Sequence, residues 1–270
     1  MPESAALPIL YRDADLVAID KPANLLVHRS EIDRHETRFA VQLLRDQIGQ
    51  KVWPAHRLDR GTSGVLLFAL DRDVGRQLSQ QFEAQRVAKT YLAVVRGHPA
   101  PSGRIDHPLT RRYDDYETRR TASDEPAQAA ITDYRRLATA ELDERVDRYP
   151  TSRYALVELS PHTGRRHQLR RHLKHIAHPI IGDATYGKGA HNRLFERLFG
   201  CQRLLLACLE MRLSHPLSGQ PLVLRAPLAD DFAHVLAQLG WADVRYGDGA
   251  PGASGCQTGN TPSSPGAQAN

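Results

Sequence analysis

Cysteine is scarce in this chain of 270 residues, which has only Cys201, Cys208 and Cys256. None of them belongs to a Cys-x-x-Cys pair, and three cysteines cannot all pair within one chain. We therefore expect neither a disulfide framework nor a cysteine zinc site. The scarcity fits a reducing compartment, and we expect a cytoplasmic protein.

Long apolar runs are also missing, although 41% of the residues are hydrophobic, enough for a sizeable core. No run approaches the ~20 apolar residues that a membrane-spanning helix needs. The first eight residues have neither the basic segment nor the long apolar segment of a secretory signal. Membrane attachment and secretion are therefore not expected.

Acidic residues are absent between Glu158 and Asp183, in a chain whose formal net charge is +5. Within this gap, residues 163–176 have Leu169, Leu173 and Ile176 at helical spacing, which predicts an amphipathic helix. Its cations are Arg165, Arg166, Arg170, Arg171 and Lys174. No acid in the run neutralises them, so their mutual repulsion favours an external polyanion, and we expect RNA or DNA as the ligand.

Histidines cluster in the same region, which raises the question of a metal site. They are His162, His167, His172, His175 and His178. The His-Glu-x-x-His pattern is absent, no cysteine or acid lies nearby, and the surrounding cations would oppose a divalent ion. We expect packing and hydrogen bonding from these histidines, and no metal.

The most informative segment present is 56–64, His-Arg-Leu-Asp-Arg-Gly-Thr-Ser-Gly. It places Asp59 between Arg57 and Arg60 and ends in a Thr-Ser-Gly turn signal, and the apolar run 65–70 that follows predicts a buried strand. The flanking cations favour the ionised form of Asp59, which could act as a nucleophile or base from a loop beside the core. The alternative is a solvated surface ion pair, worth only ~0–1 kcal/mol.

The remaining pattern predicts an α+β fold with a mixed, largely antiparallel sheet and flanking helices. Strands are expected in 8–20 on either side of a turn at 13–15, and over 65–70, 91–95, 154–159 and 203–213. Helices are expected over 37–48 with Gly49 at the C′ position, after an Asp71 cap, and over 229–239. One domain would span 8–245, with a solvated loop at 111–126 and a disordered Gly/Ser/Pro-rich tail over 246–270.

Several of these segments together resemble the RluA-type pseudouridine synthases, in order and spacing, over roughly residues 8–228. The matching runs are 18–22 (Ala-Ile-Asp-Lys-Pro) with 27–28, 56–59 with 62–64, 89–91 (Lys-Thr-Tyr), 164–172 and 178–187. One departure is Ala23-Asn24, where relatives commonly carry a glycine. Asparagine tolerates the left-handed backbone of such a turn, so the turn can survive.

The resemblance implies the catalytic fold of this family and the isomerisation of uridine in RNA. It identifies Asp59 with the family's catalytic aspartate, Tyr91 with its active-site tyrosine, which packs on the base and is a candidate for moving a proton, and Arg170 with the arginine that pairs with the aspartate. RNA contacts are expected from Arg57, Arg60, Arg165, Arg166, His167, Arg171 and Lys174. Because the reaction needs no redox change, hydrolysis or energy input, no cofactor is expected. The first strand begins near residue 8, so no preceding S4 module is expected, and a monomer is the family default.

The RNA target is predicted less directly. Segments 26–30 and 45–50 and an insertion near Asn192 are similar to family members that act on tRNA, which implies a uridine near position 65 in the acceptor stem. The alternatives are another tRNA site or ribosomal RNA, a non-catalytic RNA-binding protein, and an N-glycoside hydrolase. The hydrolase is disfavoured because most glycoside hydrolases use two carboxylates.

Overall fold

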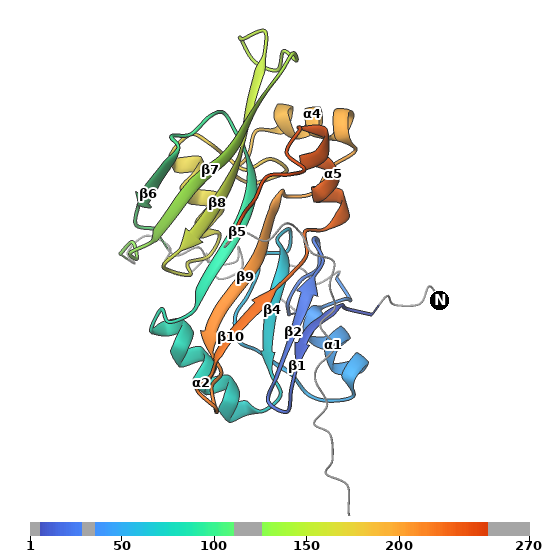
Figure 1. Cartoon of the computed structure of the whole chain (residues 1–270), viewed down its shortest axis with the longest axis vertical. Helices are drawn as coiled ribbons and strands as arrows, with labels where there is room; N and C mark the ends of the chain where they lie inside the picture. The colour runs from blue at the N-terminus through green and yellow to red at the C-terminus, as the bar shows by residue number, and fades with distance from the viewer. Residues whose placement is uncertain (1–5, 29–35, 111–125, 248–270) are drawn as a thin grey trace, which may run out of the picture.

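Strands dominate the computed structural model of the protein, which describes residues 6–28, 36–110 and 126–247 (Figure 1). They form one 10-stranded sheet in the order β1-β2-β4-β9-β5-β8-β7-β6, with β10 paired to β9 and β3 to β4. The strands are β1 (Ile9–Arg12), β2 (Leu16–Lys21), β3 (Trp53–Pro54), β4 (Ser63–Ala69), β5 (Ala88–Arg96), β6 (Ser102–Asp106), β7 (Ile131–Leu142), β8 (Ser152–Pro161), β9 (Leu206–Ser214) and β10 (Pro221–Arg225). Among these strand pairs only β4 and β9 run parallel, so the mixed, largely antiparallel sheet predicted from the sequence is confirmed.

Helices cover both faces of the sheet. They are α1 (Ala40–Ile48), α2 (Arg72–Glu83), α3 (Gln168–His175), α4 (Gly189–Phe199) and α5 (Asp230–Gln238). The first three share a core with Tyr91 and Ala93, whereas α4 and α5 share a second core with Leu92 and Val94. Successive residues of a strand point to opposite faces, so the two cores lie on opposite sides of β5. Figure 1 shows α4 and α5 next to each other, and their core includes residues of the central strands β5, β8 and β9.

The local signals for turns and caps are confirmed. Asp13 Oδ1 accepts hydrogen bonds from the backbone N–H groups of Asp15 and Leu16 at 2.8 and 2.7 Å, which makes the turn between β1 and β2. Asp71 accepts from the N–H groups of the first turn of α2, and Gly49 ends α1 at a φ of 68°. These short-range devices depend only on neighbouring residues, which is why the sequence reveals them.

Two predicted helices begin later than expected. Helix α1 begins at Ala40 because Phe39 forms a bridge with Leu26. Helix α3 begins at Gln168, so the prediction of a helix over 163–176 is wrong for its first five residues. His167 has a φ of 55°, which no α-helix accommodates, and the segment before it is held by the side chain of Gln168.

Helix α4 and the strands β3, β6, β7 and β10 were not predicted from the sequence pattern. Strand β7 has its apolar residues separated by polar and charged ones and is only partly buried, so it lacks the continuous run that marks a core strand. With β8 it forms a long hairpin that extends beyond the body of the sheet (Figure 1). No helix among the described residues could cross a membrane.

At the C-terminal end, Tyr246 packs against the second core, and Gly247 N donates to Glu158 Oε2 at 2.6 Å. The rest of the predicted tail, 248–270, and all but the last residue of the predicted loop 111–126 lie outside the described residues. The domain boundary proposed at 245 stays a prediction.

Candidate active site

Asp59 lies in the loop between β3 and β4, on the wall of a cavity of about 530 Å³. Its carbonyl oxygen accepts a hydrogen bond from Thr62 N at 3.1 Å, which closes a tight turn over 59–62. The neighbouring Leu58 is buried in the first core and holds the loop against it. The side chain of Asp59 is 19% exposed, so it is accessible from the cavity and still close to the apolar interior.

Two partly buried polar contacts hold this loop on the sheet. His56 Nε2 accepts a hydrogen bond from Leu67 N of β4 at 3.1 Å, and its ring stacks on Phe82 of α2 at 5.1 Å. Lys21, at the end of β2, donates from Nζ to the carbonyl oxygen of Arg60 at 3.2 Å. Burial, and then the positive charge of Lys89, lower the pKa of His56 to about 3, so its ring is neutral and its nitrogen remains an acceptor.

Gly64 allows the first residues of β4, which follow the Asp59 loop, to lie directly beside β9. The predicted Thr-Ser-Gly turn is only partly correct, because Ser63 and Gly64 already belong to β4 and pair with β9. Gly64 has a φ of 104°, and a Cβ there would lie 2.0 Å from the carbonyl oxygen of Cys208. Only glycine permits this approach of the two parallel strands.

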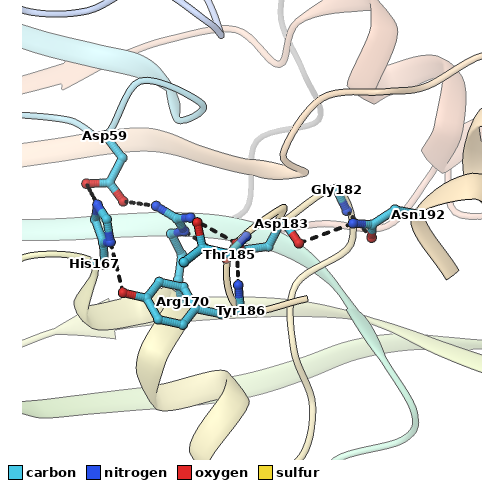
Figure 2. A network of polar contacts seen from close by, with 8 residues as sticks. All are labelled: Asp59, His167, Arg170, Gly182, Asp183, Thr185, Tyr186 and Asn192. Atoms are coloured by element: carbon cyan, nitrogen blue, oxygen red, sulfur yellow. Dashed lines mark hydrogen bonds and ion pairs between the residues drawn. The ribbon is translucent and has the colours of Figure 1, made fainter. Parts of the chain in front are cut away.

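Arg170, on α3, joins Asp59 to a second carboxylate (Figure 2). Its Nη1 donates to Asp59 Oδ2 at 3.2 Å, while Nε and Nη2 donate to Asp183 Oδ2 and Oδ1 at 2.7 and 2.9 Å. Burial alone would lower the pKa of Arg170, but Asp183 and then Asp59 raise it above its ordinary value. Arg170 is therefore a permanent cation between two carboxylates.

This contact bears on two expectations about charge. Arg170, which the family resemblance implied as the partner of Asp59, contacts it from 111 positions along the chain, and the neighbouring Arg60 pairs with Glu36. Arg57 and Arg60 both line the cavity, as their proposed contact with a nucleotide requires. The basic run of α3 is also not without intramolecular acids, because Arg170 pairs with two acids that lie outside the run.

His167 lies directly before α3 with its ring between Asp59 and Tyr186 (Figure 2). Its Nε2 is 3.9 Å from Asp59 Oδ1, and its Nδ1 is 3.0 Å from the Tyr186 hydroxyl. Burial lowers its pKa to about 4, although Asp59 acts in the opposite direction. His167 is thus a neutral group on the cavity wall next to Asp59, and its expected contact with RNA stays a prediction.

Tyr91 lies on β5 in the first core and is 9% exposed. Burial raises the pKa of its phenol well above the ordinary value, and contact with Cys208 and the charge of Asp59 raise it further. The phenol is therefore protonated at neutral pH. Tyr91 is not one of the described residues that line the cavity. The charge of Asp59 still acts on its phenol, which indicates that the two side chains lie close together.

The other cations predicted to contact RNA are spread over the surface around α3. Arg166 lines the cavity. Arg165 Nε donates to the carbonyl oxygen of Ala129 at 3.1 Å, and Arg171 Nη1 donates to that of Thr110 at 2.9 Å. Lys174 is exposed, with Nζ 5.9 Å from the centre of the Tyr186 ring. Their role in RNA binding stays a prediction.

Asp183 lines the cavity but was not predicted as a site residue. Its run, 178–187, was matched to the family but interpreted as a loop that closes the domain. The available signal was position, because Asp183 is the first acid after the long acid-free segment. An isolated buried acid next to a cationic helix indicates an ion pair.

A possible metal site exists elsewhere, at Asp13, Asp15 and His215, whose ligand atoms all lie within 4.8 Å of one another. None of the three lines the cavity. Asp13 already accepts hydrogen bonds from Tyr11 and from two backbone N–H groups, and His215 Nε2 lies 3.1 Å from it. These contacts account for the cluster without an ion.

Comparison with known proteins supports one family. A family model described as RNA pseudouridylate synthase matches residues 15–175. A protein of Pectobacterium carotovorum named tRNA pseudouridine synthase C is 51% identical over 90% of this chain, which spans only 65% of that protein. A protein of Vibrio cholerae with the same name is 48% identical over 88% of this chain and 97% of its own length.

Solved structures agree with these sequence matches. Human RNA pseudouridylate synthase domain containing 4 shares 29% identity with a TM-score of 0.64, covering 86% of this chain and 93% of the human one. Human RNA pseudouridylate synthase domain containing 1 gives 27% identity and a TM-score of 0.63 over 84% and 86% of the two chains. The sheet and its flanking helices thus have relatives of known structure.

Proposed function

Because this chain belongs to the RNA pseudouridylate synthase family, as its sequence motifs predicted, we propose that it converts one uridine of tRNA into pseudouridine, with Asp59 as the nucleophile. The observation that carries this proposal is the position of Asp59 on the cavity wall, 3.2 Å from the Arg170 guanidinium. A carboxylate held by a cation and open to a cavity is a suitable nucleophile.

The proposed reaction is an isomerisation that balances without a co-reactant. The bond between N1 of uracil and C1′ of ribose breaks, the base turns, and C5 bonds to C1′. The proton that C5 loses is balanced by the one that N1 gains. The uridine must first leave its stack, at a cost of a few kcal/mol. In this account Arg57 and Arg60 hold the extruded nucleotide, while the cations around α3 contact its phosphates.

Tritium release from tRNA labelled at C5 of uridine tests the role of Asp59. Wild-type protein should release tritium, and Asp59→Asn should lower the rate by at least about 1000-fold, because the amide cannot attack. Asp46→Asn, which removes an exposed carboxylate of α1, is the matched control and should react at the wild-type rate. Equal rates for Asp59→Asn and wild type would refute the assignment and leave the non-catalytic RNA-binding alternative, whereas free uracil among the products would indicate the hydrolase.

Tyr91 is proposed to lie against the base and to take part in proton movement. The charge of Asp59 acts on its phenol, which supports a place near the reacting atoms. Tyr91→Phe keeps the ring and removes the hydroxyl, so a proton role predicts a fall in kcat of about 100-fold or more with little change in KM. A phenylalanine variant with wild-type kcat would restrict Tyr91 to packing.

The proposed target is the uridine at position 65 in the acceptor stem of tRNA. The names of the relatives that are 51% and 48% identical to this chain support tRNA, and cytoplasmic tRNA agrees with the location expected from the cysteine content. Pseudouridine mapping of total RNA from a deletion strain should show loss of the modification at position 65 and its return with the plasmid-borne gene. Loss at another tRNA position or in ribosomal RNA would replace this target and leave the chemistry intact.

A further inference from the structure

Arg170 divides its guanidinium unequally between two carboxylates (Figure 2). Two nitrogens donate to the two oxygens of Asp183, at 2.7 and 2.9 Å, and only one donates to Asp59, at 3.2 Å. The side chain of Asp183 is 0% exposed, whereas that of Asp59 is 19% exposed. The shorter, two-point pair is therefore made with the carboxylate that solvent does not reach.

The Asp183 carboxylate is also held from its other side. Its Oδ1 accepts hydrogen bonds from the backbone N–H groups of Thr185 and Tyr186, both at 2.9 Å. Burial raises the pKa of Asp183, but the bonds from Arg170 and from these two N–H groups outweigh burial and leave the pKa below its ordinary value. Asp183 is therefore ionised and has little freedom to rotate away from Arg170.

Helix α4 holds the backbone of the same loop from the opposite face of the sheet. Asn192 Nδ2 donates to the carbonyl oxygen of Asp183 at 3.1 Å, and its Oδ1 accepts from Gly182 N at 2.8 Å. Gly182 has a φ of 79°, and a Cβ there would lie 1.8 Å from the carbonyl oxygen of Arg203. The loop thus has one tightly defined position, set by one asparagine and one close backbone approach.

We propose that Asp183 is a positioning residue for the reaction at Asp59, and that Asn192 fixes its place. Asp183 engages Nε and Nη2 of Arg170, and of the donors that remain only Nη1 is bonded to Asp59, through Oδ2, so Asp59 Oδ1 stays outside the ion pair. This inference rests on the proposed function, because it concerns the same nucleophile.

Charge explains why a third group is needed. A guanidinium left alone with one carboxylate forms a two-point pair that engages both oxygens and draws charge from them. Asp183 prevents a two-point pair between Arg170 and Asp59. Its own two-point pair with Arg170 is close to neutral and holds the guanidinium in its present orientation. Asp59 thus keeps one oriented hydrogen bond and most of its negative charge. Without Asp183, Arg170 can turn toward Asp59 and form the two-point pair there.

Asp183→Asn is the direct test. The amide oxygen can still accept from the N–H groups of Thr185 and Tyr186, so the turn is retained, but the amide nitrogen cannot accept from Arg170. In the tritium-release assay we expect kcat to fall by about 100-fold, the scale of a roughly 1 Å misplacement of reacting groups, with KM within about threefold of wild type. A kcat loss at constant KM marks an interaction made in the transition state.

The matched control is Asp133→Asn. Asp133 forms an equivalent two-point pair with Arg104, at 2.7 and 2.9 Å, on an exposed part of β7. Its loss should leave kcat within about twofold of wild type. A kcat for Asp183→Asn within threefold of wild type, or a change in KM alone, would overturn the proposal. Wild-type protein that released no tritium would instead overturn the proposed function and this inference with it.

Asn192→Ala keeps the test decisive if Asp183→Asn fails to fold, which circular dichroism would reveal. The substitution removes both hydrogen bonds from α4 to the loop and leaves Arg170 and both carboxylates in place. We expect kcat to fall by about tenfold, again with KM little changed. A kcat within twofold of wild type in a folded Asn192→Ala protein would overturn the proposal.

Discussion

Lys21 and Arg60, 39 positions apart in the chain, meet where the Lys21 ammonium donates to the Arg60 carbonyl oxygen at 3.2 Å. The same ammonium donates to the carbonyl oxygens of Leu25 and Pro22, at 2.7 and 2.9 Å, and its side chain is fully buried. One lysine of β2 therefore satisfies three carbonyl groups. It also ties the residue that follows Asp59 to the central sheet.

Replacing this lysine should destabilise the whole domain. Lys21→Met preserves the apolar stem but leaves three partly or fully buried carbonyl groups without their donor. Because each such group costs ~1–3 kcal/mol, we expect the free energy of unfolding to fall by at least about 2 kcal/mol. Urea titration followed by circular dichroism measures it. The exposed Lys51→Met is the control, with an expected change below about 0.5 kcal/mol. Equal urea midpoints for the two variants would contradict the structural role.

Substitutions at Gly64 and Gly49 distinguish the cost of backbone strain from the cost of a steric clash. Both have positive φ, 104° and 68°, but only at Gly64 would a Cβ meet a neighbour, the Cys208 carbonyl oxygen at 2.0 Å. We expect Gly49→Ala to cost about 1–2 kcal/mol and Gly64→Ala to cost distinctly more, with loss of the β4–β9 contact. Thermal melting of both variants measures the difference. Similar melting temperatures would show that β9 yields easily at this point.

His56 should make stability depend on pH. Its folded pKa of about 3 lies below the ordinary value of 6.5, so the unfolded chain binds more protons between these values. The stabilisation is complete above pH 6.5 and is lost as the pH falls through this window. Between pH 7 and 5, protonation of His56 should lower the free energy of unfolding of the wild type by about 1–2 kcal/mol. Partial exposure of the ring keeps this loss modest, because solvent screens the charge. Urea titrations of wild type and His56→Gln at both pH values should differ by that amount, with the exposed His234→Gln as the control.

Lys174 tests the predicted RNA surface. Its exposed ammonium lies on the outer side of α3, so Lys174→Ala should weaken tRNA binding and reduce the slope of log affinity against log salt by about one contact. Filter binding at several salt concentrations measures both quantities. Arg76→Ala on α2, which removes an exposed cation paired to Asp73, should leave the slope unchanged. Identical slopes for all three proteins would exclude Lys174 from the phosphate contacts.

The sequence predicted the parts of the fold whose cause is local. The apolar run of β4 and the Asp71 cap of α2 need only neighbouring residues to be recognised. Strand β7 was not predicted because it is only partly buried between its chain neighbours β6 and β8, and its apolar residues form no continuous run. Helix α4 has no side-chain cap at its start, so its marks in the sequence are the spacing of Leu194 and Phe195 with later apolar residues and the terminal Gly200.

The candidate site shows the same limit. Asp59 is visible as an acid in a loop before a core strand, but periodicity says nothing about a partner 111 positions away. Arg170 was identified by resemblance to a family, and Asp183 was missed because its role arises only when α3 and the following loop meet. Conversely, Asn24 was expected to adopt a left-handed backbone, and its φ of 63° confirms this.

Strand β9 lies between β4 and β5 in the sheet, although it comes more than a hundred residues after both. During synthesis on the ribosome, the two halves of the sheet therefore have no strand to join them until residues 206–214 have emerged. The inner edge of β5 and the Ser63–Gly64 end of β4 stay unpaired for that interval, open to wrong partners. Because the contact that closes this gap is so distant in sequence, we expect the closure to be slow.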